Sequence, residues 1–255
     1  MADLLPFPIK IATAFQSEFP EPAGIRATVV VASYNYDRYL LETLQSVRAQ
    51  THKNLELIIV DDHSSDRSVE LAKGWMTDNQ TRFWRTKLLV HGQNCGLFQT
   101  RNTGFEHANA EYIFSLDSDN ILYPSAISKM LNGCLNAKAQ AAYSQLEFFD
   151  EVSQVGCVGI WDPARLAQGN YIDAMALIKK SAWDAVSGYS RLIKPGFEDY
   201  DLWCKFVRLG FHGAFIPEVL CRYRIHADSM LRQMSEQEVE ESYSEIILRH
   251  PWLRL

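Results

Sequence analysis

The sequence has no long hydrophobic run and only five cysteines, and both features limit the class of protein. No apolar stretch approaches the roughly 18 residues that cross a bilayer. The opening MADLLPFPIK lacks the charge order and apolar core of a signal peptide. The cysteines are odd in number, widely spaced and without a C-x-x-C pair, which argues against a disulfide framework or a zinc site. We therefore expect a soluble, cytoplasmic protein, with a peripheral contact at the inner face of the membrane left open.

Several common motifs are also missing. The chain has no G-x-G-x-x-G fingerprint and no G-x-x-x-x-G-K-[ST] loop, which argues against a nicotinamide dehydrogenase and a P-loop NTPase. It also lacks G-x-S-x-G and H-E-x-x-H, the signatures of the most easily recognised hydrolases. Its 25 basic and 31 acidic side chains give a net charge of −6, so we expect no nucleic-acid partner.

Strand and helix patterns alternate along the first half of the chain. Residues 27–32 and 111–116 are short apolar runs, typical of strands buried on both faces of a sheet. Segments with helical spacing separate such runs, a pattern that predicts βαβ crossovers. We predict an α/β fold with a Rossmann-like, mainly parallel sheet flanked by helices. Beyond residue 120 the order is looser, and we expect further helices at 124–137 and 198–209 and strands at 141–149, 172–178 and 214–223.

We expect one domain between two less regular ends. Residues 1–25 contain four prolines without sustained periodicity, and we predict an extended N-terminal arm there. The domain would span residues 26–230, and residues 231–255 would form an acidic helical tail.

Polar clusters follow three of the predicted strands, at residues 33–35, 61–62 and 117–119. Each cluster alone is compatible with a turn or a helix cap. Together they predict a binding site, because ligands of open parallel sheets bind at the carboxyl ends of the strands. Asp117 and Asp119 lie one residue apart, and their oxygens suit Mg²⁺ or Mn²⁺ beside a phosphate-bearing substrate.

These motifs, in this order, resemble glycosyltransferase family 2, which has the GT-A fold and inverts the anomeric carbon. The resemblance covers roughly residues 26–230. It rests on residues 29–35 (VVVASYN), 58–66 (IIVDDHSSD), 94–96 (NCG), 101–104 (RNTG), 111–119 (EYIFSLDSD), 196–203 (GFEDYDLW) and 222–226 (RYRIH). It departs from the family pattern at His63, where glycine is usual, and at Ala32, where proline or threonine is common.

The resemblance implies a metal-assisted transferase that uses a nucleoside-diphosphate sugar, with a UDP-sugar favoured. Residues 26–120 would bind the donor, and residues 121–230 would carry the acceptor site and the catalytic groups. Asp199 would be the general base, and Glu198 would orient it or contact the acceptor. Donor nucleotide binding is assigned to Ala32, Tyr34, Asn35, Asp62, Arg101 and Asp117, and metal binding to Asp117, Asp119 and His226.

The acceptor implied by the resemblance is a hydroxyl of a saccharide or a lipid-linked sugar, as in the assembly of bacterial surface polysaccharides. The chain ends soon after His226, which favours addition of a single sugar. The alternative is a catalytically silent module that binds nucleotide sugars, or a partner subunit. For Arg101, a salt bridge on a helix surface competes with a contact to phosphate. A sugar-phosphate nucleotidyltransferase is disfavoured, since its glycine- and basic-rich loop is replaced here by residues 33–37.

Overall fold

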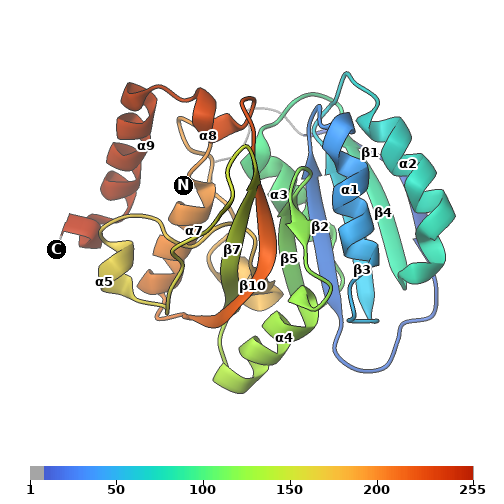
Figure 1. The fold of residues 1–255 in the computed structure, drawn as a ribbon, viewed down its shortest axis with the longest axis horizontal. Coiled ribbons are helices and arrows are strands. Elements are labelled where there is room, and N and C mark those ends of the chain that lie inside the picture. The colour runs from blue at the N-terminus through green and yellow to red at the C-terminus, as the bar shows by residue number, and fades with distance from the viewer. Residues whose placement is uncertain (1–8, 255) are drawn as a thin grey trace.

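Short apolar, β-branched segments form the centre of a mixed, mainly parallel sheet. In a computed structural model, which describes residues 9–254, ten strands join in this sheet, with helices on both faces (Figure 1). Their order is β1-β4-β3-β2-β5-β9-β7-β10-β6, and β8 pairs with β7. The strands are β1 (Ile11–Glu18), β2 (Ala27–Ser33), β3 (Leu55–Asp61), β4 (Arg85–His91), β5 (Tyr112–Asp117), β6 (Ile121–Leu122), β7 (Ala141–Asp150), β8 (Gln154–Val155), β9 (Leu177–Lys179) and β10 (Gly213–Ile225).

Parallel pairing joins β4, β3, β2 and β5, and also β7 and β10. The remaining pairs are antiparallel. The predicted α/β class is confirmed. The helices are α1 (Asp37–Arg48), α2 (Ser68–Asn79), α3 (Leu97–His107), α4 (Ala126–Ala137), α5 (Pro163–Leu166), α6 (Lys180–Ala185), α7 (Glu198–Arg208), α8 (Met230–Gln233) and α9 (Glu236–Arg249), with 3₁₀ turns η1 (Gln80–Arg82) and η2 (Pro251–Arg254).

The central strand β2 is buried on both faces, which explains its continuous apolar run. Successive side chains of a strand point to opposite faces of the sheet. Accordingly, Val29 and Val31 belong to one buried cluster with Leu44 of α1. Val30 belongs to a second cluster with Phe105 of α3. The two clusters pack the helices onto opposite sides of the sheet.

Three parallel strands deliver their polar ends to the same edge. Ser33 at the end of β2 is paired with Asp61 of β3, and Ala32 is paired with Asp117 of β5. The convergence of these three polar clusters, expected from the sequence, is confirmed.

The N-terminal segment differs from the expected arm. Residues 11–18 form β1, which pairs antiparallel with β4 from Ile11 opposite His91 to Glu18 opposite Arg85. The segment therefore extends the sheet, and the domain begins before residue 26. Its half-exposed burial pattern, typical of an edge strand, explains why the periodicity was too weak to predict it. Residues 1–8 of the expected arm lie outside the described residues.

The second half also differs in detail. The strand expected at 172–178 is reduced to β9, because Asp173 accepts a hydrogen bond from the backbone N–H of Met175 and turns the chain before it. The expected helical tail contains α9, which begins with a capping box between Ser235 and Glu238. Residue 255 lies outside the described residues.

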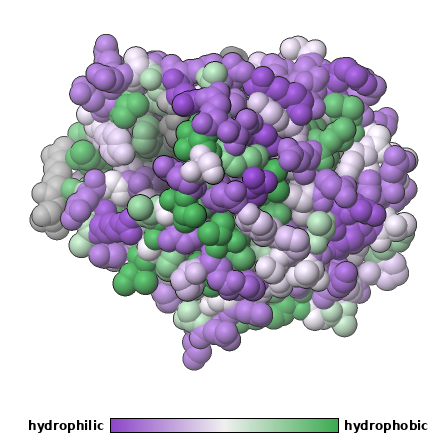
Figure 2. Space-filling model, in the orientation of Figure 1, coloured by the Kyte–Doolittle hydropathy of each residue, from purple (hydrophilic) through white to green (hydrophobic). Residues whose placement is uncertain are grey.

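Both hydrophilic and apolar side chains are exposed on the surface. Figure 2 shows hydrophilic residues over much of the upper part of one face, with apolar residues gathered near its centre. Large exposed apolar side chains are spread over several helices, such as Leu41 on α1 and Leu248 on α9. Among the described residues, no helix has the length and apolar character to span a bilayer.

Candidate active site

The polar strand ends surround a cavity of about 390 Å³, a size typical of sites for small organic ligands. The start of α3, the start of α7 and the segment before β9 complete its wall. Eight residues predicted from the sequence line it: Ala32, Tyr34, Asp62, Arg101, Asp117, Asp119, Glu198 and Asp199.

Two predicted residues lie outside this lining. Asn35 adopts a left-handed backbone with φ of 55°, and its side-chain oxygen accepts a hydrogen bond from the Ser65 N–H at 2.8 Å. It therefore fixes the turn between β2 and α1 to the loop after β3. His226 does not line the cavity either, but it contacts Asp119, which does. Tyr34 lines the cavity and is 45% exposed, so its ring is free to stack on a ligand.

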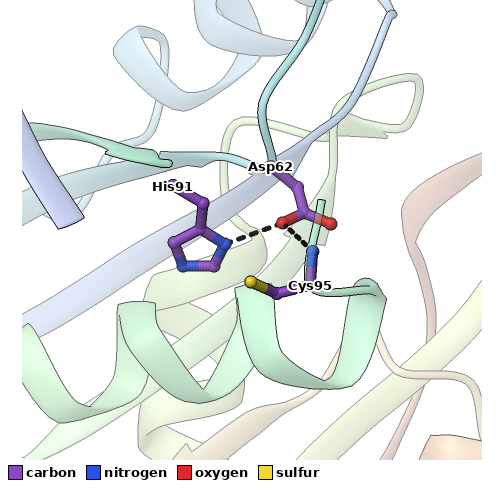
Figure 3. Close-up of side chains that lie close together, drawn as sticks. All are labelled: Asp62, His91 and Cys95. Atoms are coloured by element: carbon purple, nitrogen blue, oxygen red, sulfur yellow. Dashed lines mark hydrogen bonds and ion pairs between the residues drawn. The ribbon is translucent and has the colours of Figure 1, made fainter. Parts of the chain in front are cut away.

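The Asp62 carboxylate is held by three N–H donors, and Figure 3 shows the contacts with His91 and Cys95. Its Oδ1 accepts from His91 Nδ1 at 2.7 Å and from the Cys95 N–H at 2.8 Å. Its Oδ2 accepts from the Gly96 N–H at 2.8 Å. Gly96 has φ of 87°, a conformation that suits glycine because it has no Cβ. The end of β4 and the start of α3 thus fix this side chain against the cavity.

Arg101 and Asp117 both line the cavity and form an ion pair in which Arg101 is buried and Asp117 is partly exposed. The Arg101 Nη2 donates to Oδ1 of Asp117 at 2.9 Å and to Oδ2 at 3.1 Å. Burial lowers the pKa of Arg101, but the charges of Asp117, Glu198 and Asp199, together with Tyr189, outweigh this effect and the net pKa is raised. Arg101 is therefore a permanent cation within the site, which replaces the alternative of a salt bridge on the helix surface.

Asp119 is paired with His226, whose Nε2 lies 3.1 Å from Oδ2 of the carboxylate. Burial and the neighbouring Asp117 charge raise the pKa of Asp119. Two carboxylates that repel each other, with an imidazole beside one of them, form a donor set that a divalent cation would stabilise. Asp119 and His226 are in contact, with Asp117 nearby, but among the described residues these three do not converge as closely as Asp62, His91 and Cys95, whose ligand atoms lie within 4.8 Å of one another, so their role as ligands of Mg²⁺ or Mn²⁺ stays a prediction.

Asp199 lies in the first turn of α7. Its Oδ1 accepts from the Tyr200 N–H at 2.8 Å, and its Oδ2 accepts from Asn170 Nδ2 at 3.0 Å. Burial, followed by the nearby Asp173 charge, raises the pKa of Asp199 to about 7. A carboxylate with a pKa near neutrality is suited to accept and release a proton at physiological pH.

Glu198 is 2% exposed, and its Oε2 accepts a hydrogen bond from the Gly196 N–H at 2.8 Å. Burial raises its pKa as well. The side chain thus ties the loop before α7 to the helix, while it also lines the cavity. The printed partners of Asp199 are Asn170 and the Tyr200 N–H, so the role of Glu198 in orienting Asp199 or contacting the acceptor stays a prediction.

Three further residues of the site were not predicted from the sequence. Asp173 lines the cavity, and burial raises its pKa to about 6. Asn170 contacts Asp199, and His91 contacts Asp62. Asn170 and Asp173 lie in an irregular stretch without a motif, and His91 had no pattern around it, so only the folded structure reveals them.

Comparisons with known proteins agree with this geometry. The family model described as "Glycosyl transferase family 2" matches residues 28–182. The putative glycosyltransferase EpsE of Bacillus subtilis is 26% identical over 86% of this chain and 80% of its own length. An uncharacterized glycosyltransferase of Rickettsia felis is 35% identical, over 84% of this chain and 36% of its own length. The chain thus spans only about a third of the second relative.

Solved structures resemble the fold at low sequence identity. TarS residues 1–349 from S. aureus, in complex with UDP-GlcNAc, has a TM-score of 0.72 and 14% identity, over 88% of this chain and 66% of that chain. The mannosyltransferase PcManGT from Pyrobaculum calidifontis, in complex with GDP-Man and Mn²⁺, has a TM-score of 0.68 and 17% identity. That match covers 93% of this chain and 70% of the other.

The sheet, the carboxylate-lined cavity and these likenesses define a glycosyltransferase with the GT-A fold. The chain belongs to glycosyl transferase family 2.

Proposed function

We propose that this protein transfers a sugar from a nucleoside-diphosphate sugar to a hydroxyl of a saccharide or lipid-linked acceptor, with inversion. A UDP-sugar is the favoured donor. The observation that carries the proposal is that Asp199, with a pKa near 7, shares one cavity with Asp117 and Asp119. One side of the cavity is thereby suited to proton transfer and the other to a diphosphate.

The donor side follows from the contacts already described. Asp62 offers a fixed carboxylate for the edge of the base, and the exposed ring of Tyr34 offers a stacking surface. Arg101 contributes a buried positive charge near the diphosphate, compensated by Asp117. The complexes of TarS with UDP-GlcNAc and of PcManGT with GDP-Man support a nucleotide sugar as the donor.

Asp117, Asp119 and His226 would hold Mg²⁺ or Mn²⁺ on this side. The Mn²⁺ in the PcManGT complex supports this assignment. When bound, the ion would act as a Lewis acid for the charge that develops on the departing nucleoside diphosphate.

On the acceptor side, Asp199 takes the proton of the attacking hydroxyl. The new bond from that oxygen to the anomeric carbon forms as the bond to the diphosphate oxygen breaks, so the configuration inverts. Asn170 and the Tyr200 N–H each hold one carboxylate oxygen of Asp199. These contacts restrict its orientation, which favours a productive geometry for proton transfer.

Donor binding can be tested by the thermal stability of the purified protein against UDP-, GDP-, CMP- and dTDP-sugars, with and without Mn²⁺. A ligand specific for the folded state adds about 2.7 kcal/mol of stability at a hundredfold excess over its dissociation constant. We expect a rise in the midpoint with one nucleotide class, larger with Mn²⁺ than without it. No rise with any of them would contradict the proposal.

The alternative of a catalytically silent nucleotide-sugar module makes a different prediction. It shares the midpoint shift but predicts no release of nucleoside diphosphate in the presence of acceptors. The raised pKa of Asp199 favours the enzyme, because a binding module gains nothing from a carboxylate whose ionisation is disfavoured by burial.

A further inference from the structure

We propose that His91 is a positioning residue for the donor nucleotide, which acts through Asp62 and does not itself touch the ligand. The proposal rests on the proposed function, in which Asp62 faces the base. It concerns the contacts behind Asp62, where His91 and then Thr103 form a buried chain of hydrogen bonds.

One of the Asp62 carboxylate oxygens can accept a further hydrogen bond. Its Oδ1 already accepts two hydrogen bonds, from His91 Nδ1 and the Cys95 N–H. Its Oδ2 accepts one, from the Gly96 N–H. A carboxylate oxygen accepts two hydrogen bonds readily, so Oδ2 retains one acceptor site. Because Asp62 lines the cavity, this site is available to a donor group on a ligand.

The neighbours of His91 assign its tautomer. The oxygens of the Asp62 carboxylate only accept hydrogen bonds, so the ring nitrogen beside them, Nδ1, is the donor, and the Thr103 hydroxyl can donate to Nε2 at 3.0 Å. Nε2 is then an acceptor, and the proton of the ring lies on Nδ1, where it is donated to Asp62. His91 and Thr103 are 1% and 0% exposed, so water does not compete for these bonds.

The consequence is that Asp62 presents an acceptor to the cavity and no donor. Uracil and guanine carry an N–H at the central position of the base-pairing edge, whereas cytosine and adenine carry an acceptor nitrogen there. Loss of the His91 bond frees the Asp62 side chain to rotate and to seek other donors. We therefore expect His91 to control both the affinity for the base and the preference for uracil or guanine over cytosine or adenine.

A metal site is the competing explanation for the same residues. Asp62, His91 and Cys95 offer ligand atoms that lie within 4.8 Å of one another. However, both ring nitrogens of His91 already have partners, and Oδ1 of Asp62 already accepts two hydrogen bonds. Burial also raises the pKa of the Cys95 thiol, which disfavours the thiolate that a metal needs. The hydrogen-bonded arrangement therefore favours the positioning role.

Two substitutions distinguish the contribution of Nδ1, which contacts Asp62, from that of Nε2, which contacts Thr103. His91→Asn places an amide N–H near the position of Nδ1 and retains a donor to Asp62. His91→Gln reaches toward Thr103 and removes the donor from Asp62. Calorimetric dissociation constants for UDP, CDP, GDP and ADP are measured with Mn²⁺ for the wild type and both variants.

We expect the wild type to bind UDP more tightly than CDP, or GDP more tightly than ADP. In His91→Gln the preferred nucleotide should lose about tenfold or more in affinity, as for a lost hydrogen bond to a charged group. The dissociation constant of the other nucleotide of the pair, CDP or ADP, should change little. The ratio of the two dissociation constants should therefore move toward one. His91→Asn should stay within about threefold of the wild type.

If His91→Gln binds the nucleotides with the same affinities and the same preference as the wild type, the role of His91 is overturned. Equal losses of affinity in His91→Gln and His91→Asn would overturn it too. Stoichiometric zinc in the purified protein, lost in Cys95→Ser, would overturn it in favour of a metal site. A wild type that binds no nucleotide would instead overturn the proposed function itself. If His91→Gln does not fold, ¹⁵N NMR of the wild-type ring decides. A proton on Nδ1 supports the proposal, and a proton on Nε2 alone overturns it.

Discussion

At the scale of single residues, two partly buried carboxylates, Asp173 and Asp199, line the cavity on the side proposed for the acceptor. Burial raises the pKa of Asp173 to about 6, and burial with the Asp173 charge raises that of Asp199 to about 7. Both groups therefore change charge in the range where an enzyme is assayed. The proposed base is thereby sensitive to pH and to its neighbour.

The rate of transfer should depend on the ionisation of Asp199. A general base acts only when deprotonated, so kcat/KM should fall as the pH falls, with its midpoint near pH 7. Asp173→Asn removes a negative charge that raises this pKa, so its midpoint should lie at lower pH. Initial rates between pH 5 and 9 measure both profiles. A wild-type profile that is flat from pH 5.5 to 8 would contradict the assignment.

The same carboxylate should reduce stability at high pH. Its pKa is raised in the folded state, so the stability it contributes is present below its unfolded pKa, near 4, and is lost as the pH rises through about 7. Asp199→Asn carries no charge and should be more stable than the wild type at pH 8, by about 1–3 kcal/mol. Urea unfolding at pH 8 and pH 4.5 measures the difference. A gain as large at pH 4.5 would show that charge is not its cause.

At the scale of elements, the site depends on how closely α3 packs against β2. A Cβ added at Gly104 of α3 would lie 2.2 Å from Cγ1 of Val30. Helix α3 can pack this closely against β2 because residue 104 has no side chain. The start of the same helix supplies the Gly96 N–H that holds Asp62.

Alanine at Gly104 should therefore push α3 away from the sheet. We expect Gly104→Ala to lose about 1–3 kcal/mol of stability, as for overpacking of a core, and to weaken nucleotide binding. Gly74→Ala is the matched control, since a Cβ at Gly74 of α2 meets nothing within 4 Å. It should be neutral or stabilising by up to about 1 kcal/mol. Chemical unfolding compares the two, and equal effects would contradict the close packing.

At the scale of the whole molecule, the tail packs onto the second half of the domain. Ile246 of α9 is fully buried in the cluster that contains Trp203 of α7. His250 Nε2 lies 2.8 Å from Oδ1 of Asp201, on the same helix as Asp199. The helix that carries the proposed base is therefore supported by the C-terminal segment.

Loss of this packing should destabilise the protein. Ile246→Ala should cost about 2–5 kcal/mol, as for large-to-small changes in a core. Leu248→Ala, on the same helix but 70% exposed, should change stability by less than about 0.5 kcal/mol. Both are measured by urea unfolding. An Ile246→Ala variant as stable as the wild type would show that α9 is not docked in solution.

The sequence predicted the centre of the fold better than its edges. Strand β2 was predictable because a strand buried on both faces has a continuous apolar run, and the polar end that follows it marked the site. Strand β1 was not, because an edge strand is half exposed. Asn35 was expected to bind donor, but its partner Ser65 lies in another loop. His91 and Asn170 act through contacts between distant segments, which no local pattern encodes.

The most direct test of the central claim is the rate of sugar transfer by Asp199→Asn, measured beside its affinity for the donor. The substitution removes the base at nearly constant side-chain size, but its amide can accept only one of the two hydrogen bonds from Asn170 and the Tyr200 N–H, so the donor affinity is measured as the control for altered geometry. We predict that transfer falls by at least about a hundredfold while the donor dissociation constant stays within about threefold. Transfer at the wild-type rate would contradict Asp199 as the general base.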